Sequence, residues 1–300
     1  MDNKKLKSEN NKLVIAISSR ALFNLDQSHK IFKEKGIEAY AKHQQENEHV
    51  ILEPGVGFTL VKKLLKLNSK KTPIDVILLS RNSADTGLRI FNSIEHYDLN
   101  ISRAAFTRGE STHPFVGAFE ADLFLSSNYN DVQKALQSGY AAASIVESKS
   151  NNSHPSQLRI AFDGDAVIFS DESERIFQEK GLEAFHENEI LSEKIELKAG
   201  PFKSFLVSLQ KIQSTFPEED NPIRTALVTA RSAPSHRRVI HTMRKWGIRI
   251  DESFFLGGLE KGVFLRQFAA DIFFDDQQQH CESASQYVPT GHVPSGIKNS

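Results

Sequence analysis

The sequence predicts an α/β fold made of two parallel-sheet units that follow one another along the chain. Short apolar runs alternate with longer amphipathic segments, the pattern of buried parallel strands connected by helices. The chain also resembles itself: LVIAISSRALFNLDQSHKIFKEKGIEAY from Leu13 matches LRIAFDGDAVIFSDESERIFQEKGLEAF from Leu158 at a constant offset of 145 (158 − 13). A chain of 300 residues is long enough for two such units.

A second block of similarity has a slightly longer offset. Pro73-Ile74 matches Pro222-Ile223, and the segment ADLF at 121–124 matches ADIF at 270–273, an offset of 149 (271 − 122). Four residues were therefore gained in the second repeat or lost from the first. We expect a disordered N-terminus over 1–12, a first repeat over 13–147, a polar linker over 148–157 and a second repeat over 158–300.

In the first repeat, β-rich apolar runs and helical periodicity predict strands over 13–18, 75–79, 122–125 and 141–145, and helices over 27–44, 58–68, 84–94 and 131–138. In the second repeat they predict strands over 158–162, 225–228 and 271–274, and helices over 172–188 (with a break at Gly181), 202–216, 234–246 and 262–268. The tail VPTGHVPSGI, at 288–297, is expected to be a loop.

The composition is that of a globular protein without a polyanionic partner. Hydrophobic residues make up 39% of the chain, charged residues 25%, and the formal net charge is −1, so we expect neither nucleic-acid nor membrane binding. A single cysteine, Cys281, excludes an internal disulfide framework and fits a reducing compartment. The apolar run 13–17 is too short for a signal peptide or a membrane span, so a cytoplasmic location is expected.

Polar residues follow three of the predicted strands of the second repeat. Asp163 follows the first, Thr229 ends the second, and Asp275-Asp276 ends the third. Because ligands of parallel sheets gather at the carboxyl ends of the strands, these side chains are expected to converge. In the first repeat the same offsets lead to Ser18, Ser80, Ser126 and Ser127, with Arg20 opposite Asp165 and Thr112 opposite Lys261. The chemistry is therefore predicted to reside in the second repeat.

Carboxylates at this density call for a cation. Asp163 and Asp165 flank Gly164, which allows a tight turn, so that with Asp275 and Asp276 up to four carboxylates surround one site. Mg²⁺ prefers carboxylate oxygens together with water and phosphate. Lys261 and the Thr229 hydroxyl add donors for phosphate oxygens. The set indicates Mg²⁺-assisted phosphoryl transfer.

These motifs resemble a known superfamily. FDGDAVIF, LVTARS, Lys261-Gly262 and DIFFDDQ are similar to the four motifs of haloacid dehalogenase-like phosphatases. Longer strings, including FDGDAVIFSDESE, PIRTALVTARS and MRKWGIRIDESFFLGG, resemble the cytosolic 5′-nucleotidase I family, which prefers AMP, as do SSRALF and HYDLNISRAAFTRGES of the first repeat. The resemblance spans roughly residues 13–297. It implies tandem haloacid dehalogenase-like domains, with a small helical cap over 172–200 in the second.

The resemblance also implies roles for individual residues. Asp163 is the expected nucleophile, forming an aspartyl-phosphate, and Asp165 the expected general acid and base. Thr229 and Lys261 are expected to hold phosphoryl oxygens, while Asp275 and Asp276 hold Mg²⁺. The implied reaction is hydrolysis of a nucleoside 5′-monophosphate, AMP or a deoxy counterpart, to nucleoside and phosphate, so the chain is expected to be a phosphoric monoester hydrolase.

Several alternatives stay open. The leaving group could be a sugar or another small phosphate, and a non-catalytic nucleotide-binding regulator is a rival from a different class. Arg231 and Ser232 could contact the phosphate or base, or Arg231 could pair with a nearby acid. Gly55-Val56-Gly57 is interpreted as a helix-start turn rather than a phosphate loop. A nucleotide effector bound without metal beside Arg20, and a homo-oligomer, are left open.

Overall fold

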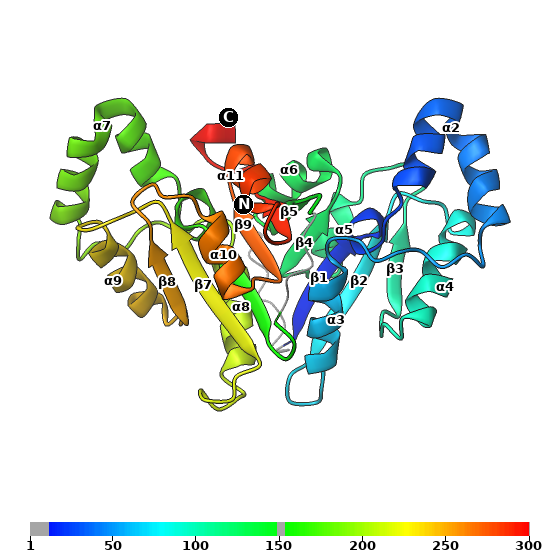
Figure 1. Ribbon diagram of the computed structural model, residues 1–300, viewed down its shortest axis with the longest axis horizontal. Coiled ribbons are helices and arrows are strands. Elements are labelled where there is room, and N and C mark those ends of the chain that lie inside the picture. Colours follow the sequence, from blue (N-terminus) through cyan, green and yellow to red (C-terminus); the bar gives the residue numbers. More distant parts are fainter. Residues whose placement is uncertain (1–11, 149–153, 300) are drawn as a thin grey trace.

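The structure is a computed structural model that describes residues 12–148 and 154–299. Lys12 apart, the predicted disordered N-terminus (1–12) lies outside the described residues, as does the middle of the predicted linker (148–157). We call 12–148 the first half and 154–299 the second half. Together they form one ten-stranded sheet with helices on both faces (Figure 1). An α/β fold with a large, mostly parallel sheet is therefore confirmed.

The strands of the first half are β1 (Leu13–Ser18), β2 (Ile74–Ser80), β3 (Arg103–Phe106), β4 (Leu123–Ser126) and β5 (Ala141–Val146). Its helices are α1 (Ser19–Leu22), α2 (Asp26–Glu46), α3 (Phe58–Leu67), α4 (Leu88–His96), α5 (His113–Ala118) and α6 (Tyr129–Gln137). A short 3₁₀ turn, Asp85–Gly87, precedes α4.

The strands of the second half are β6 (Leu158–Phe162), β7 (Ile223–Thr229), β8 (Glu252–Phe255), β9 (Ile272–Asp275) and β10 (Thr290–His292). Its helices are α7 (Glu172–Leu191), α8 (Lys203–Gln213), α9 (His236–Trp246), α10 (Gly262–Phe268) and α11 (Gln278–Ala284). A wide turn, Gly164–Ile168, follows β6, and a 3₁₀ turn, Ile297–Asn299, ends the described chain.

The order of the strands reads the same from either end of the sheet. The order is β3-β2-β1-β4-β5-β10-β9-β6-β7-β8, and every pair is parallel except β5 with β10, which join the halves. In each half the chain starts in the middle, moves outward over two strands and returns to the other side of the first. The crevice between β1 and β4, and that between β6 and β9, is thus the point where the strand order reverses, the usual ligand position in open α/β sheets.

The apolar core is continuous across both halves on one face of the sheet. There, side chains of α3, α4, α8 and α9 pack on the strands, including Val61, Phe205 and the buried rings of Phe162 and Phe274. The opposite face carries two separate clusters, one under α5 and α6 and one under α10 and α11. Alternate strand residues serve the two faces, which explains why the central strands are apolar throughout.

Two reciprocal polar contacts tie the halves together. Lys63 of α3 donates to both carboxylate oxygens of Asp271 at 2.7 and 2.8 Å, and Ser208 of α8 donates to Asp122 at 2.7 Å. Asp122 and Asp271 each also accept a backbone N–H of the first strand of their own half. Corresponding acids therefore anchor a strand start and a helix of the opposite half.

Two long helices stand at the carboxyl edge and are bent back on themselves. Gly36 in α2 and Gly181 in α7 both have φ near +81°, a conformation that glycine adopts at little cost. The predicted break at Gly181 is confirmed, and the bent helices overhang opposite ends of the sheet (Figure 1). Before α3, a Cβ on Gly55 or Gly57 would approach the Ala21 carbonyl oxygen to 2.9 or 3.0 Å, so these glycines serve a packed helix-start turn.

Some elements differ from the sequence-based expectation. Strands β3 and β8 were not predicted, because at the sheet edges their residues are half-exposed and lack a long apolar run. The tail was predicted to be a loop, which is wrong for Thr290–His292: these residues form β10 between β5 and β9. Among the described residues, no helix is long and apolar enough to cross a membrane.

Candidate active site

The site begins where β6 ends. Asp163 follows Phe162, and its backbone N–H donates to the carbonyl of Phe274 on neighbouring β9 at 2.8 Å. The chain then turns through Gly164–Ile168, with Ala166 at φ +59°. A Cβ on Gly164 would lie 3.3 Å from the Thr229 hydroxyl at the end of β7. This close approach of backbone to hydroxyl brings the ends of β6, β7 and β9 around one point.

Three carboxylates and a lysine meet at that point. Asp163, Asp275 and Asp276 each offer an oxygen within 4.8 Å of the others, and all three are buried. The ammonium of Lys261, itself buried, donates to Asp163 and to Asp275 at 2.6 Å each. The predicted convergence of these four residues is observed, and the excess negative charge suits a small, hard cation.

The pKa values of the three acids differ because Lys261 donates hydrogen bonds to Asp163 and Asp275 but not to Asp276. Burial, with the Asp275 charge, raises the pKa of Asp163 to about 7, although Lys261 opposes the shift. Burial and the like charges of Asp163 and Asp275 raise the pKa of Asp276 to about 9. For Asp275 burial also acts upward, but Lys261 and His280 outweigh it and lower the pKa to about 2. The cluster therefore lacks positive charge, which a divalent cation would supply.

Asp165 lies outside this carboxylate cluster. The guanidinium of Arg231 binds both of its oxygens, from Nε at 2.8 Å and from Nη2 at 2.7 Å. The expectation that four carboxylates share one site therefore holds for three of them. The reason is local: the turn after Gly164 sends the Asp165 side chain toward the end of β7, where Arg231 stands two residues beyond Thr229.

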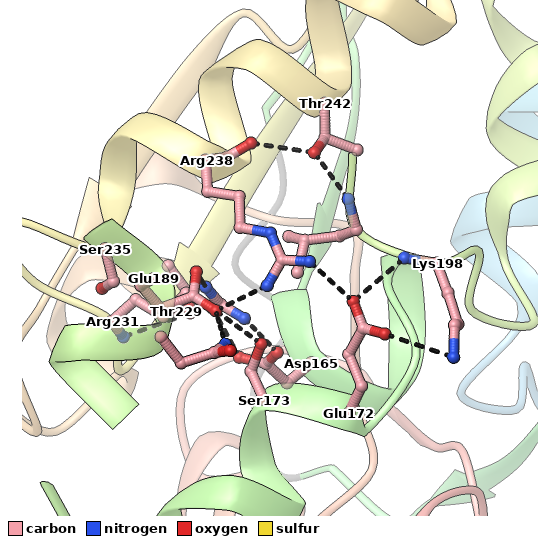
Figure 2. A network of polar contacts seen from close by, with 12 residues as sticks. Asp165, Glu172, Ser173, Glu189, Lys198, Thr229, Arg231, Ser235, Arg238 and Thr242 are labelled. Carbon is pink, nitrogen blue, oxygen red and sulfur yellow. Dashed lines mark hydrogen bonds and ion pairs between the residues drawn. The ribbon is translucent and has the colours of Figure 1, made fainter. Parts of the chain in front are cut away.

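The alternative that Arg231 pairs with a nearby acid is the one observed, and Arg231 belongs to a larger buried network whose other members the sequence analysis did not identify (Figure 2). Its Nη1 donates to Glu189 at 2.6 Å, and Arg238 of α9 donates to the other Glu189 oxygen at 2.9 Å. Ser173 donates to the same carboxylate at 2.8 Å across the bend of α7. Glu189 therefore fastens both arms of α7 to the core and holds Arg231 against Asp165. Burial acts to lower the pKa of Arg231, but the negative charges of Asp165 and Glu189 outweigh burial and raise this pKa above its ordinary value.

A signal for this network exists in the sequence. Ser28 and Gln44 correspond to Ser173 and Glu189 at the offset of 145, and Arg89 corresponds to Arg238 at 149. In the first half Ser28 and Arg89 both donate to Gln44, at 3.2 Å each. The same arrangement thus occurs twice, with an acid in the second half only.

Thr229 and Ser232 take different positions. Thr229 is buried at the end of β7, and its hydroxyl accepts the backbone N–H of Arg231 at 3.2 Å. Ser232 lies beyond, half-buried, and donates to the Ala233 carbonyl at 3.4 Å. Thr229 therefore faces the convergence point, whereas Ser232 lies farther along the loop.

The C-terminal tail supports the cluster from behind. His292 of β10 contacts the backbone carbonyl of Asp276 through Nε2 at 2.9 Å, and Asn299 donates to the same carbonyl at 2.8 Å. His280 of α11 lies 3.4 Å from Asp275. The neighbouring thiol of Cys281 is buried and donates to the Asp275 carbonyl at 3.4 Å, so it packs against the site rather than into it.

The corresponding edge of the first half holds hydroxyls. Ser18 accepts the N–H groups of Ala21 and Ser127, and Ser19 and Ser80 share a hydrogen bond of 3.0 Å. The metal-type cluster found among the described residues comes wholly from the second half. The predicted asymmetry of acids between the halves is therefore present in space as well as in sequence.

Carboxylates and a lysine that meet at the carboxyl edge of an α/β sheet form an arrangement suited to binding a phosphate group. A family model described as 5′-nucleotidase matches residues 5–300, so the chain belongs to the 5′-nucleotidase family. The family that the motifs predicted is thereby confirmed.

A human protein is similar in sequence to most of the chain. Over 290 residues the chain is 40% identical to human cytosolic 5′-nucleotidase 1B, covering 92% of this chain and 48% of that protein. The chain therefore spans about half the length of this relative. No solved structure matches the chain.

Proposed function

We propose that the second half hydrolyses nucleoside 5′-monophosphates, AMP or a deoxy counterpart, in a Mg²⁺-dependent reaction. One observation carries the proposal: Asp163, Asp275 and Asp276 converge beside Lys261 in a chain of the 5′-nucleotidase family. Acids at the carboxyl edge supply a nucleophile and cation ligands, and the lysine supplies charge for a phosphoryl group.

The residues present fit a magnesium ion. Three carboxylate oxygens lie within one small volume, and burial together with the charges of the neighbouring carboxylates raises the pKa of Asp163 and of Asp276. Asp163, Asp275 and Asp276 would hold the ion, which would neutralise charge on the phosphoryl group and orient it. Asp165, which the sequence added to this ligand set, has its carboxylate bound by Arg231 and is not proposed as a carboxylate ligand.

The reaction follows in two steps from the chain's own groups. An oxygen of Asp163 attacks phosphorus, the bond from phosphorus to the ribose 5′-oxygen breaks, and Asp165 delivers a proton to that oxygen. Water then attacks the phosphorus of the aspartyl-phosphate, Asp165 takes its proton, and phosphate leaves with Asp163 regenerated. Arg231 positions Asp165 for both transfers.

Lys261 and Thr229 are proposed to hold the phosphoryl oxygens. Both are buried beside Asp163, and an ammonium or hydroxyl placed there acts in surroundings of low polarity, where such contacts are strong. Arg231 is committed to Asp165 and Glu189, so direct recognition of the substrate is proposed for Ser232 rather than for Arg231.

The finer architecture is part of the same proposal. We propose a duplicated haloacid dehalogenase-like fold with repeats over 13–147 and 158–300. The mirrored strand order, the paired glycine bends and the matching contacts of Asp122 and Asp271 support it. We propose that residues 172–200, with α7, form the cap over the site. A cytoplasmic location, consistent with the single buried cysteine, is also proposed.

The test is phosphate release from a panel of nucleoside 5′-monophosphates, ribose 5-phosphate and other sugar phosphates, with Mg²⁺ and with EDTA. We expect Mg²⁺-dependent release from AMP or dAMP and little from the sugar phosphates. Release from sugar phosphates alone would keep the mechanism and overturn the substrate. No release from any compound, by a folded protein that binds AMP, would favour a non-catalytic regulator and overturn the proposal.

A further inference from the structure

A cavity of about 750 Å³ lies at the carboxyl edge of the first half, not over the carboxylate cluster. Ser18 at the end of β1 and Ser126 at the end of β4 line it, so it occupies the crevice where the strand order reverses. Phe32, Ile37 and Tyr40 of the bent helix α2 form its outer wall. Its volume is in the range of small-molecule sites.

The charges of this cavity are reversed relative to the second half. Arg20 stands at the position that corresponds to Asp165, and Asn82 at that of Arg231. Arg81 and Arg108 also line the cavity. Two acids line it too, but both have partners: Arg81 and Thr112 bind the carboxylate of Asp131, and Gln45 donates to Asp85 at 2.8 Å. With serines in place of the clustered acids, the cavity suits an anion and needs no metal.

Two buried donors in the wall lack an acceptor. Among the described residues, neither Nε of Arg20 nor Nδ2 of Asn82 has a hydrogen-bond partner. The remaining contact of the Arg20 side chain is a 3.3 Å pair with exposed Asp26. Buried N–H groups are normally satisfied, so two of them at one cavity indicate a missing acceptor.

The orientation of Asn82 is fixed by a chain of hydrogen bonds. Arg89 can only donate, and it donates to the oxygen of Gln44 at 3.2 Å. The Gln44 amide nitrogen therefore donates to the Tyr40 hydroxyl at 3.1 Å, which in turn donates to the oxygen of Asn82 at 2.8 Å. The nitrogen of Asn82 is left as the unpaired end of the chain.

The outer wall is apolar and aromatic. Phe32 is 45% exposed and Ile37 61% exposed, although both line the cavity. The ring of Phe32 stacks on His29, at 6.3 Å between centroids and 17° between planes, and meets Tyr40 edge to face. A flat, apolar group entering here would cover side chains that are otherwise in water.

We propose that this cavity is a second ligand site, which binds a phosphorylated small molecule with a planar ring system, the chemistry of a nucleotide, without metal. The phosphate accepts from Arg20 and Asn82, and the ring system lies against Phe32 and Tyr40. The ligand is not hydrolysed there, because Ser18 replaces the attacking carboxylate and its hydroxyl oxygen accepts two backbone N–H groups. The site does not depend on the reaction proposed for the second half.

The test is isothermal titration of the whole protein with AMP in EDTA, with adenosine, ribose 5-phosphate and inorganic phosphate as further probes. We expect EDTA-resistant AMP binding that is weakened at least tenfold in Arg20→Leu and in Asn82→Ala. Arg237→Leu, which removes an exposed arginine paired with Glu193 far from the cavity, is the matched control and should bind normally. Each variant is compared with the wild type by thermal melting.

Three results would overturn the site. These are no binding of AMP in EDTA, binding that survives both cavity variants but is lost in Lys261→Met, and adenosine binding as tightly as AMP. The first would leave the cavity without a ligand of this class. The second would assign the binding to the carboxylate cluster, and the third would remove the role of the phosphate. Because hydrolysis is measured separately with Mg²⁺, failure here is distinguishable from failure of the proposed reaction.

Discussion

Arg231, which follows β7, binds both carboxylate oxygens of Asp165, in the turn after β6, at 2.8 and 2.7 Å. A guanidinium holds a carboxylate in one plane, so this contact fixes the direction of the Asp165 oxygens as well as their position. Glu189, at 2.6 Å, fixes Arg231 in turn. The orientation of the proposed general acid therefore depends on a residue of the bent helix α7.

Replacing Arg231 with lysine keeps the charge and removes the two-pronged contact. We expect kcat for AMP to fall at least about 10-fold, because the Asp165 carboxyl is no longer held for proton transfer. Substrate affinity should change less, because Arg231 is not proposed to touch the substrate. Steady-state kinetics check this, and an unchanged kcat with a raised KM would contradict the positioning role.

Glu189 holds two arginines in the interior. Its side chain is fully buried, so Glu189→Ala leaves Arg231 and Arg238 with less counter-charge and should cost about 3–5 kcal/mol of unfolding free energy. Glu193→Ala is the matched control. Glu193 pairs with Arg237 at 3.5 Å, and the Arg237 side chain is mostly exposed, so the loss of unfolding free energy should be below about 1 kcal/mol. Urea unfolding measures the free energy of unfolding of both variants. Equal losses would contradict the role of Glu189 as the buried partner of the two arginines.

Metal and protons compete for the carboxylate cluster. The folded pKa of Asp276, about 9, lies above its ordinary value, so its stabilising contribution is present at low pH and is lost as the pH rises toward 9. The same holds for Asp163 up to about 7. Mg²⁺ requires deprotonated ligands, so the rise in Tm on adding saturating Mg²⁺ should be larger at pH 8 than at pH 6.

Differential scanning calorimetry at the two pH values, with and without EDTA, checks this dependence. Asp276→Asn should reduce the Mg²⁺ effect at both pH values and should stabilise the metal-free protein at pH 8, because folding then no longer requires the uptake of a proton at this position. An Mg²⁺ effect that is equal at pH 6 and pH 8 would show that these acids do not bind the ion.

The contact of Lys63 with Asp271 joins the two halves. The Asp271 side chain is fully buried and Lys63 is 16% exposed, so Lys63→Met should cost about 2–3 kcal/mol. Ser208→Ala removes only the corresponding 2.7 Å hydrogen bond to Asp122 and should cost about 1 kcal/mol. Chemical denaturation measures both values. Two separate transitions in the wild type would contradict the shared sheet and core.

The sequence predicted the central strands because both faces of each strand are buried. Runs such as 13–17 and 225–228 are therefore apolar or small throughout. The edge strands β3 and β8 could not be found in this way, since their outer sides meet water. Thr290–His292 has no strand pattern of its own, and its strand conformation depends on the backbones of β5 and β9.

The site was predictable where a residue directly follows a strand. Asp163, Thr229 and Asp275 fall into this class, and the parallel sheet fixes their common edge. The position of Asp165 was not predictable, because it depends on the turn at Ala166 and on Arg231. For the first half, the sequence showed only which residues replace the acids. It did not predict the cavity, because the aromatic wall depends on the bend of α2 at Gly36.

The most direct test of the central claim compares Asp163→Asn with Ser18→Ala, its counterpart in the first half, by phosphate release from AMP in Mg²⁺. Ser18 and Asp163 occupy equivalent positions at the carboxyl ends of β1 and β6, so the two folded variants compare the two halves directly. We predict that Asp163→Asn lowers kcat by about 10³-fold or more while Ser18→Ala stays near the wild-type value. An active Asp163→Asn enzyme, or a loss of activity in Ser18→Ala alone, would contradict catalysis by the carboxylate cluster of the second half.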